Sequence, residues 1–166
     1  MAKKARLPDK AAVKSALEAA LASTLAATRA AAEESRRGAT HEESRAEGDK
    51  DMRSTEQSYL ARGQAMRAEE LAEELARLET TTLPAFGPES SIALGALVRV
   101  LVDEAPRVFF VVPWGGGTTL SVGGAEVTVV APSSPVGRAL VGRSAGESFE
   151  LTARGALREW EIVEVV

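Results

Sequence analysis

Between Pro8 and Thr80 the chain contains no further proline and consists largely of alanine, glutamate, arginine and leucine. These residues form helices readily. Pro8 suits the first position of a helix, where its missing N–H costs nothing. Apolar residues recur at helical spacing in two stripes, and the polar segment from Gly38 to Ser54 between them has no apolar face. This order predicts two long helices packed antiparallel as a coiled-coil hairpin.

Two apolar stripes define the faces along which these helices are expected to pack. The first contains Val13, Leu17, Leu21 and Leu25, and the second contains Tyr59, Leu60, Met66, Leu71, Leu75 and Leu78. Residues at such spacings share one face of a helix. From Asp51 to Thr80 the second helix would be about 45 Å long at a rise of about 1.5 Å per residue. We predict a hairpin over residues 1–82 with an acidic tip at about 42–56.

The pattern changes beyond the hairpin. Residues 83–88 contain two prolines and a glycine, which end a helix and indicate a linker. Residues 89–166 alternate apolar and polar side chains in short runs between turn residues, which is typical of strands. The predicted strands are 98–102, 108–112, 127–130, 149–151 and 160–165. Ser134 and Pro135 predict a capped short helix that ends at Gly142. The expected fold class is α+β, a helical hairpin followed by a small antiparallel β domain with one short helix.

Composition excludes several classes of function. The chain has no cysteine and a single histidine, so thiolate chemistry and most zinc sites are excluded. A net charge of −4 argues against general binding of duplex nucleic acid, and we expect at most weak direct DNA or RNA binding. No run approaches the roughly 20 apolar residues of a membrane span. We expect a cytoplasmic, monomeric protein with no membrane contact.

Carboxylates gather in the segment that joins the two predicted helices. Asp49 and Asp51 lie there, Glu56 follows them, and basic residues are fewer. Paired carboxylates can bind a hard cation such as Mg²⁺ or orient a water molecule. One or two exposed carboxylates leave the ion mostly hydrated, so they would form half of a shared site. The alternative is a solvated acidic turn, which is the usual role of a charge run.

The order of motifs resembles a known family. An acidic turn opens with Gly48-Asp49, and Glu56-Gln-Ser-Tyr59 leads into the second helix. The C-terminal part contains Ser134-Pro-Val-Gly-Arg-Ala-Leu-Val-Gly-Arg143 and ends in Arg158-Glu-Trp-Glu-Ile-Val-Glu-Val165. Together these motifs resemble the GreA/GreB transcript cleavage factors across nearly the whole chain.

This resemblance implies a function in bacterial transcription elongation. The C-terminal domain would have an FKBP-like fold and dock on the rim of the RNA polymerase secondary channel. The hairpin would pass down the channel until Asp49, Asp51 or Glu56 reaches the active site and the RNA 3′ end. There Asp49 and Asp51 would share Mg²⁺ with the polymerase, which then cleaves backtracked RNA. The chain would be a cofactor in trans, with no tightly bound cofactor of its own, rather than an enzyme.

The resemblance also implies a partner contact on the C-terminal domain. Its residues would be Ser134, Pro135, Val136 and Arg138, around the start of the predicted short helix. Helix capping by Ser134 is compatible with that contact. Arg138 and Arg143 either meet an acidic partner surface or are solvated. Trp114 is expected to be exposed in a glycine-rich hairpin turn, and Trp160 is expected to face the core.

The tip departs from the family pattern, which reads Asp-Leu-Ser-Glu-Asn-Ala-Glu-Tyr. Here ten steps separate Asp49 from Tyr59, three more than in that pattern. Such an insertion shifts the carboxylates by several ångströms, and catalysis that depends on placement is sensitive to this. An alternative function is therefore a channel-occupying inhibitor or regulator without cleavage activity.

Two readings from other classes remain. In the first reading the FKBP-like domain acts as a prolyl isomerase or chaperone. The active site of such an enzyme is a pocket lined with aromatic residues, and this chain has only seven. A purely structural coiled-coil adaptor would tolerate charge reversal at the tip, whereas a factor that enters a channel would not.

Overall fold

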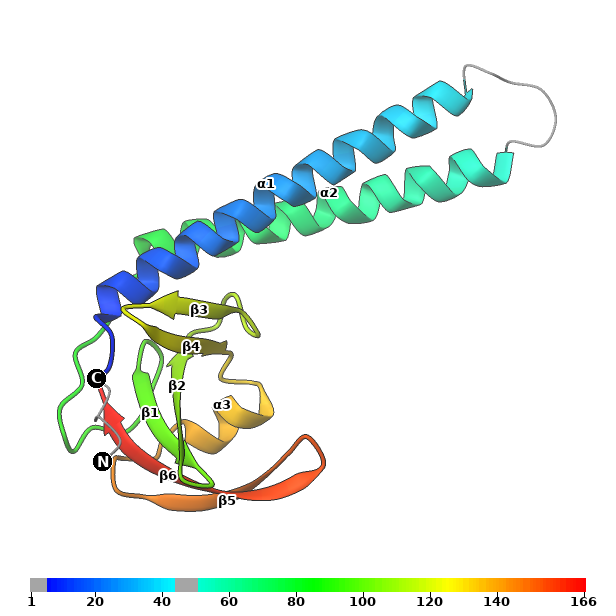
Figure 1. Ribbon diagram of the computed structural model, residues 1–166. Helices are drawn as coiled ribbons and strands as arrows, with labels where there is room; N and C mark the ends of the chain where they lie inside the picture. Colours follow the sequence, from blue (N-terminus) through cyan, green and yellow to red (C-terminus); the bar gives the residue numbers. More distant parts are fainter. Residues whose placement is uncertain (1–5, 44–50) are drawn as a thin grey trace. The chain divides into compact units, whose positions relative to one another are not determined.

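The computed structural model describes residues 6–43 and 51–166. Two compact units divide the chain: one is Glu18–Glu79, and the other joins the described residues up to Leu17 to Thr80–Val166. Two long helices come first, α1 (Lys10–Glu43) and α2 (Asp51–Thr80), and a sheet with one short helix follows (Figure 1). The predicted order of a helical pair and a β-rich domain is confirmed, and the start of α1 groups with the β-rich unit.

The ends of the long helices differ from the predicted ones. Helix α1 begins at Lys10 rather than Pro8, because the Asp9 carboxylate accepts a hydrogen bond from the backbone N–H of Ala12 at 2.9 Å and so caps the first turn. At its far end α1 continues to Glu43. Residues 38–43 and 51–54 of the segment predicted as the connection are therefore helical, although they offer no apolar face.

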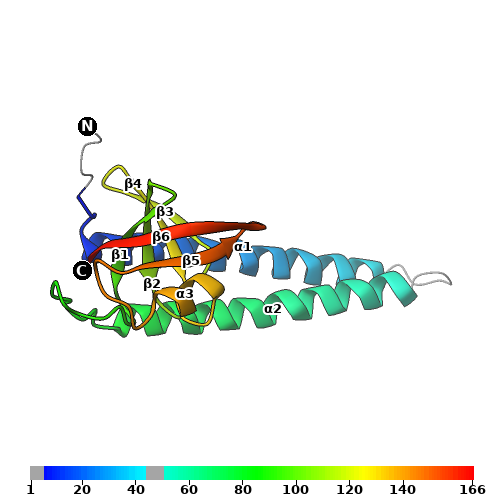
Figure 2. The same cartoon turned by 90° about the horizontal axis from the view of Figure 1, so that it is seen from below.

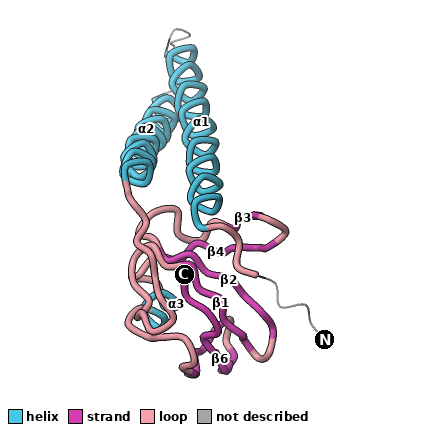
Figure 3. Tube along the Cα trace, turned by 90° about the vertical axis from the view of Figure 1, so that its left-hand side faces the viewer, coloured by secondary structure: helices cyan, strands magenta, loops and turns pink. Residues whose placement is uncertain are grey.

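Helices α1 and α2 run antiparallel and side by side, as Figure 3 shows. Ser35 donates a hydrogen bond to the side chain of Gln64 at 3.0 Å, and farther along Gly38 faces Gln57. The residues of α2 that turn inward recur at alternating steps of four and three, as in a coiled coil. They are Gln57, Ala61, Gln64, Ala68, Leu71, Leu75 and Leu78.

This inner seam corrects the predicted stripe of α2. Leu71 and Leu78 are buried as expected, but Tyr59, Leu60 and Met66 are 70%, 56% and 56% exposed. Counted back from Leu78, the heptad positions that face α1 are occupied by alanine and glutamine in the distal half of α2. Tyr59, Leu60 and Met66 lie at other positions and therefore do not face α1. Tyr59 is therefore an exposed residue and not the packing residue that the sequence suggested.

Gln57 offers a way to stabilise the hairpin. Its Oε1 atom is buried and has no hydrogen-bond partner among the described residues. An unsatisfied buried polar atom costs about 1–3 kcal/mol. We expect Gln57→Leu to raise the free energy of unfolding of the hairpin by about 1 kcal/mol, because leucine suits this seam position. Urea unfolding followed by the helical circular dichroism signal measures this, and an unchanged midpoint would contradict it.

The C-terminal unit is built on a six-stranded sheet with the order β3-β4-β2-β1-β6-β5. Its strands are β1 (Leu97–Val102), β2 (Ala105–Val111), β3 (Thr119–Val122), β4 (Ala125–Val130), β5 (Ser148–Ala153) and β6 (Ala156–Val165). Four strand pairs are antiparallel, as expected, but β2 and β4 run parallel. The sheet is mixed because β3 intervenes between β2 and β4 and pairs with β4 from the outer edge.

One face of this sheet packs against α3 (Pro135–Leu140), which lies beside the strands in Figures 1 and 2. The core there contains Val98, Val100, Leu140 and Ile162, and Trp160 faces it as predicted, with 3% exposed. On the turn after β2, Trp114 is half-buried rather than exposed. The backbone N–H of Gly117 donates to Val129 at 2.9 Å, so this turn is tied to β4.

The linker after α2 is held by the start of α1. The Lys14 ammonium donates to the carbonyl of Thr81 at 2.8 Å, and the Lys10 ammonium donates to that of Pro84 at 2.5 Å. Lys10 also lies 4.7 Å from the centre of the Phe86 ring. Partial burial lowers the pKa of Lys10 from its ordinary value. The linker is thus an ordered part of the C-terminal unit.

Candidate functional site

The predicted partner contact is built around the start of α3. The Ser134 hydroxyl accepts a hydrogen bond from the backbone N–H of Gly137 at 3.0 Å and donates to the carbonyl of Ala131 at 2.7 Å. Ser134 is extended, and Pro135 follows in the first turn. A serine cap with proline behind it satisfies the free N–H groups and presets the helical backbone. The capping predicted from the sequence is confirmed.

Gly137 permits this tight turn. A Cβ atom placed on it would lie 2.0 Å from the carbonyl oxygen of Ala131. That separation is far shorter than any real contact, and the obstacle is backbone, which does not move aside cheaply. The loop that precedes α3 therefore packs directly on the helix backbone, and its shape is fixed.

The four predicted contact residues divide into two pairs. Ser134 and Val136 are half-buried, and Val136 packs against the core. Pro135 and Arg138 are exposed, and the Arg138 guanidinium donates to the carbonyl of Ser133. A partner would thus meet Pro135 and Arg138, while Ser134 and Val136 hold the helix in place. That these residues bind a partner stays a prediction.

Two exposed apolar side chains near α3 were not singled out from the sequence. Leu94 is 52% exposed and Val141 is 40% exposed. Their segments are joined, because Gly142 donates its N–H to Ile92 at 2.8 Å and Ile92 donates to Arg143 at 2.7 Å. The sequence signal was available for Val141, which precedes the glycine that ends the predicted helix.

Arg143 has a structural role rather than a free surface charge. Its Nε donates to the carbonyl of Ala139 at 2.8 Å, and its guanidinium lies 4.6 Å from the centre of the Phe149 ring. Glu147 approaches it at 3.4 Å. These contacts hold the end of α3 against β5. Of the two arginines considered for an acidic partner, Arg138 remains the better placed.

The predicted tip carboxylates are described only in part. Asp49 lies outside the described residues, and so does the side chain of Asp51, although Asp51 begins α2. Glu56 is exposed on the second turn of α2. Among residues 6–43 and 51–166 no group of three metal-ligating side chains occurs. Whether Asp49, Asp51 and Glu56 share a Mg²⁺ ion with a partner stays a prediction.

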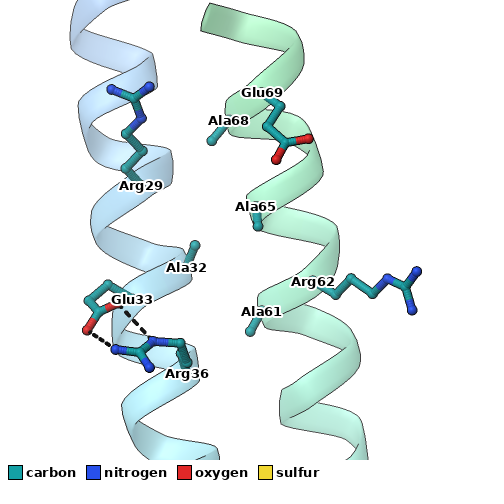
Figure 4. A pocket seen from close by; sticks show the side chains of 9 residues that line it. All are labelled: Arg29, Ala32, Glu33, Arg36, Ala61, Arg62, Ala65, Ala68 and Glu69. Carbon is teal, nitrogen blue, oxygen red and sulfur yellow. Dashed lines mark hydrogen bonds and ion pairs between the residues drawn. The ribbon is translucent and has the colours of Figure 1, made fainter.

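A groove of about 450 Å³ lies along the hairpin between α1 and α2 (Figure 4). Its floor contains Ala32, Ala61 and Ala65, whose short side chains leave the space open, and Arg29 and Arg62 stand at its rim. On α1, Glu33 pairs with the neighbouring Arg36 at 2.9 Å, and this hydrogen bond lowers the pKa of Glu33 below its ordinary value.

The aromatic residues of the sheet do not line a concave site. Phe109 and Phe149 stack on Trp160, with ring centres 5.5 and 5.8 Å apart, and Phe109 and Trp160 are buried in the core. A prolyl isomerase needs such rings on the wall of an open pocket. This arrangement disfavours the isomerase reading. In the described part of the chain, neither long helix is apolar enough to cross a membrane.

Comparisons with known proteins find similar solved structures. No protein-family model matches the chain, and no curated protein does. The GreA factor homolog 1 of Thermus thermophilus is 21% identical, with 90% of this chain and 94% of that one covered and a TM-score of 0.39. The GreA factor homolog 1 of Thermus aquaticus is 19% identical, with 91% of this chain and 94% of that chain covered and a TM-score of 0.39. A GreA/GreB elongation factor of Nitrosomonas europaea is 22% identical, with 57% of this chain and 77% of that chain covered and a TM-score of 0.38.

Proposed function

We propose that this chain is a transcription elongation factor that binds bacterial RNA polymerase and inserts its helical hairpin into the secondary channel. The observation that carries the proposal is the hairpin itself. Helices of 34 and 30 residues are joined by a segment of acidic sequence, and the shorter helix is about 45 Å long. Two carboxylates cannot form a metal site alone, but a long arm could carry them to a metal site of another protein.

The C-terminal unit would supply the docking surface. Ser134 and Gly137 fix the loop before α3, and that loop presents Pro135 and Arg138 outward. The sequence motif around them is the part of the chain that most resembles the GreA/GreB factors. A rigid loop loses little conformational entropy on binding, which favours its use as a contact.

At the tip we propose that Asp49 and Asp51 donate carboxylate oxygens to a Mg²⁺ ion shared with the polymerase, and that Glu56 assists. Oxygen ligands are the ones Mg²⁺ prefers. An ion held by both proteins would supply the Lewis acidity that activates a water for the cleavage of backtracked RNA. The chain's own residues complete the coordination and orient that water, so the chain acts as a cofactor rather than as an enzyme by itself.

The test is RNA shortening in a backtracked elongation complex with labelled RNA and Mg²⁺. We expect the wild-type chain to accelerate cleavage, and we expect Asp49→Ala or Asp51→Ala to reduce that acceleration about 100-fold without loss of binding. Arg138→Glu should instead weaken binding. Glu34→Gln, which alters an exposed carboxylate on α1, serves as the matched control and should leave cleavage unchanged.

The three extra residues between Asp49 and Tyr59 favour a second candidate, a regulator that occupies the channel without cleavage. Competitive binding to the polymerase with slowed elongation and no RNA shortening would establish that function. No binding at all would rule out both candidates and leave the structural adaptor.

A further inference from the structure

The distal half of α2 carries a large exposed surface on the side turned away from α1. Tyr59, Leu60 and Met66 lie there, and Met52 is 76% exposed close to the start of the helix. Large apolar side chains at helical spacing are normally covered. Because the inner seam of α2 already packs on α1, this surface is available to a further helix.

The exposed surface contains a second heptad seam. Six residues recur at alternating steps of three and four, the spacing with which one helix packs on another. They are Arg53, Glu56, Leu60, Gly63, Arg67 and Glu70, and all are exposed. We call this set the outer seam. It runs beside the inner seam, so α2 can contact α1 and a second helix at once.

The charged residues of the outer seam are ordered so that, in two antiparallel copies, each faces a residue of opposite charge. When two copies are laid antiparallel, Arg53 of one copy meets Glu70 of the other, and Glu56 meets Arg67. Each pair occurs twice by symmetry. A surface that is its own complement after a two-fold rotation is what an isologous dimer interface requires. A partner of another kind would have no need of this symmetry.

The centre of the outer seam fits the same register. There Leu60 of one copy meets Gly63 of the other, and a Cβ atom placed on Gly63 would have no neighbour within 4 Å. The leucine would fill the recess that the glycine leaves. In antiparallel coiled coils the positions before the seam residues also meet across the interface, and here they bring Tyr59 against Met66. Apolar contacts at the centre and charge pairs toward the ends therefore occur together.

We propose that two copies of this chain associate through the outer seam as an antiparallel pair of α2 helices. The association is expected to be weak, in the micromolar range, because the area is small and exposed ion pairs contribute less than about 1 kcal/mol each. Besides an ion pair with Glu74 at 3.7 Å, Arg67 pairs with Glu70 of its own helix at 3.0 Å, and the side chains of Arg67 and Glu70 are more than half exposed. That pair can exchange for the intermolecular one at little cost. The proposal departs from the monomer expected from the sequence and does not depend on polymerase binding.

The test uses two charge-altered chains in sedimentation velocity over a range of concentrations. In Arg53→Glu with Arg67→Glu the charged seam residues are all acidic, and in Glu56→Arg with Glu70→Arg they are all basic. We expect the dimer dissociation constant to rise at least tenfold for each variant alone, because like charges then face each other. An equimolar mixture should restore association, because every charge then meets its opposite. Higher salt should weaken the wild-type dimer.

The control exchanges the charges of the Glu33–Arg37 ion pair on α1, by Glu33→Arg with Arg37→Glu, and should leave association unchanged. Helical circular dichroism verifies that each variant is folded. A wild-type chain that sediments as a monomer at every concentration would overturn the proposal. So would a dimer that survives both seam variants, or variants whose mixture fails to associate.

Discussion

Gly137→Ala is expected to destabilise the C-terminal unit by about 3 kcal/mol, a large effect for the addition of one methyl group. The new Cβ atom would lie 2.0 Å from the carbonyl oxygen of Ala131, 2.8 Å from its carbonyl carbon and 2.9 Å from the Cα atom of Pro132. All three are backbone atoms. The loop can relieve this overlap only by moving away from α3, which would break the Ser134 cap.

Urea unfolding followed by tryptophan fluorescence measures this effect. Gly116→Ala is the matched control, because a Cβ atom there also faces Ala131 but at an ordinary 3.5 Å. We expect that variant to stay within about 0.5 kcal/mol of the wild type. Equal stability of the Gly137 variant and the wild type would mean that the loop before α3 yields easily and is not a fixed surface.

Trp160→Ala is expected to cost about 4 kcal/mol of stability in the same unit. The indole lies at the centre of the core, 3% exposed, and Phe109 and Phe149 stack on it. Removing it leaves a large cavity and two rings without a partner. Thermal unfolding followed by circular dichroism in the near ultraviolet is the appropriate measurement.

Trp160→Phe separates packing from hydrogen bonding. The indole Nε1 atom is buried and has no hydrogen-bond partner among the described residues. Replacing it with a carbon ring therefore removes an unsatisfied donor while most of the stack stays. We expect a cost of about 1–2 kcal/mol, well below that of alanine. A phenylalanine variant as unstable as the alanine variant would show that the indole nitrogen does hold a partner.

The order of elements followed from the sequence because each rests on local rules. A long run of helix-forming residues without proline predicted α1 and α2, and Ser134 followed by Pro135 predicted α3. The identity of the α2 seam did not follow, since Tyr59 and Leu60 are more apolar than Gln57 and Ala61, which pack inward. The heptad phase is set by Leu71 and Leu78 near the base, and large residues out of phase with it remain outside.

In the sheet, too, some features could be predicted from the sequence and others could not. Strands with strong β-branched runs, such as β1 and β4, were predicted, but the four-residue β3 was missed because it is short and follows a glycine-rich turn. Without β3 the parallel pairing of β2 with β4 cannot be deduced, because parallel strands need a crossover between them. At the candidate site, the role of Ser134 as a cap was predicted locally, whereas the exposure of Leu94 depends on contacts distant in sequence.

The C-terminal unit is assembled from both ends of the chain, and this has a consequence for the order of folding. Leu7 and Val13 are buried, and Lys14 holds the linker at Thr81, yet the whole hairpin lies between these segments in the sequence. Joining them without the hairpin would require closing a long loop, at an entropic cost. Helix pairing relies on contacts nearer in sequence and is fast. We therefore expect the hairpin to form first and to bring the two segments together, so that defects in its seam slow the folding of the C-terminal unit as well.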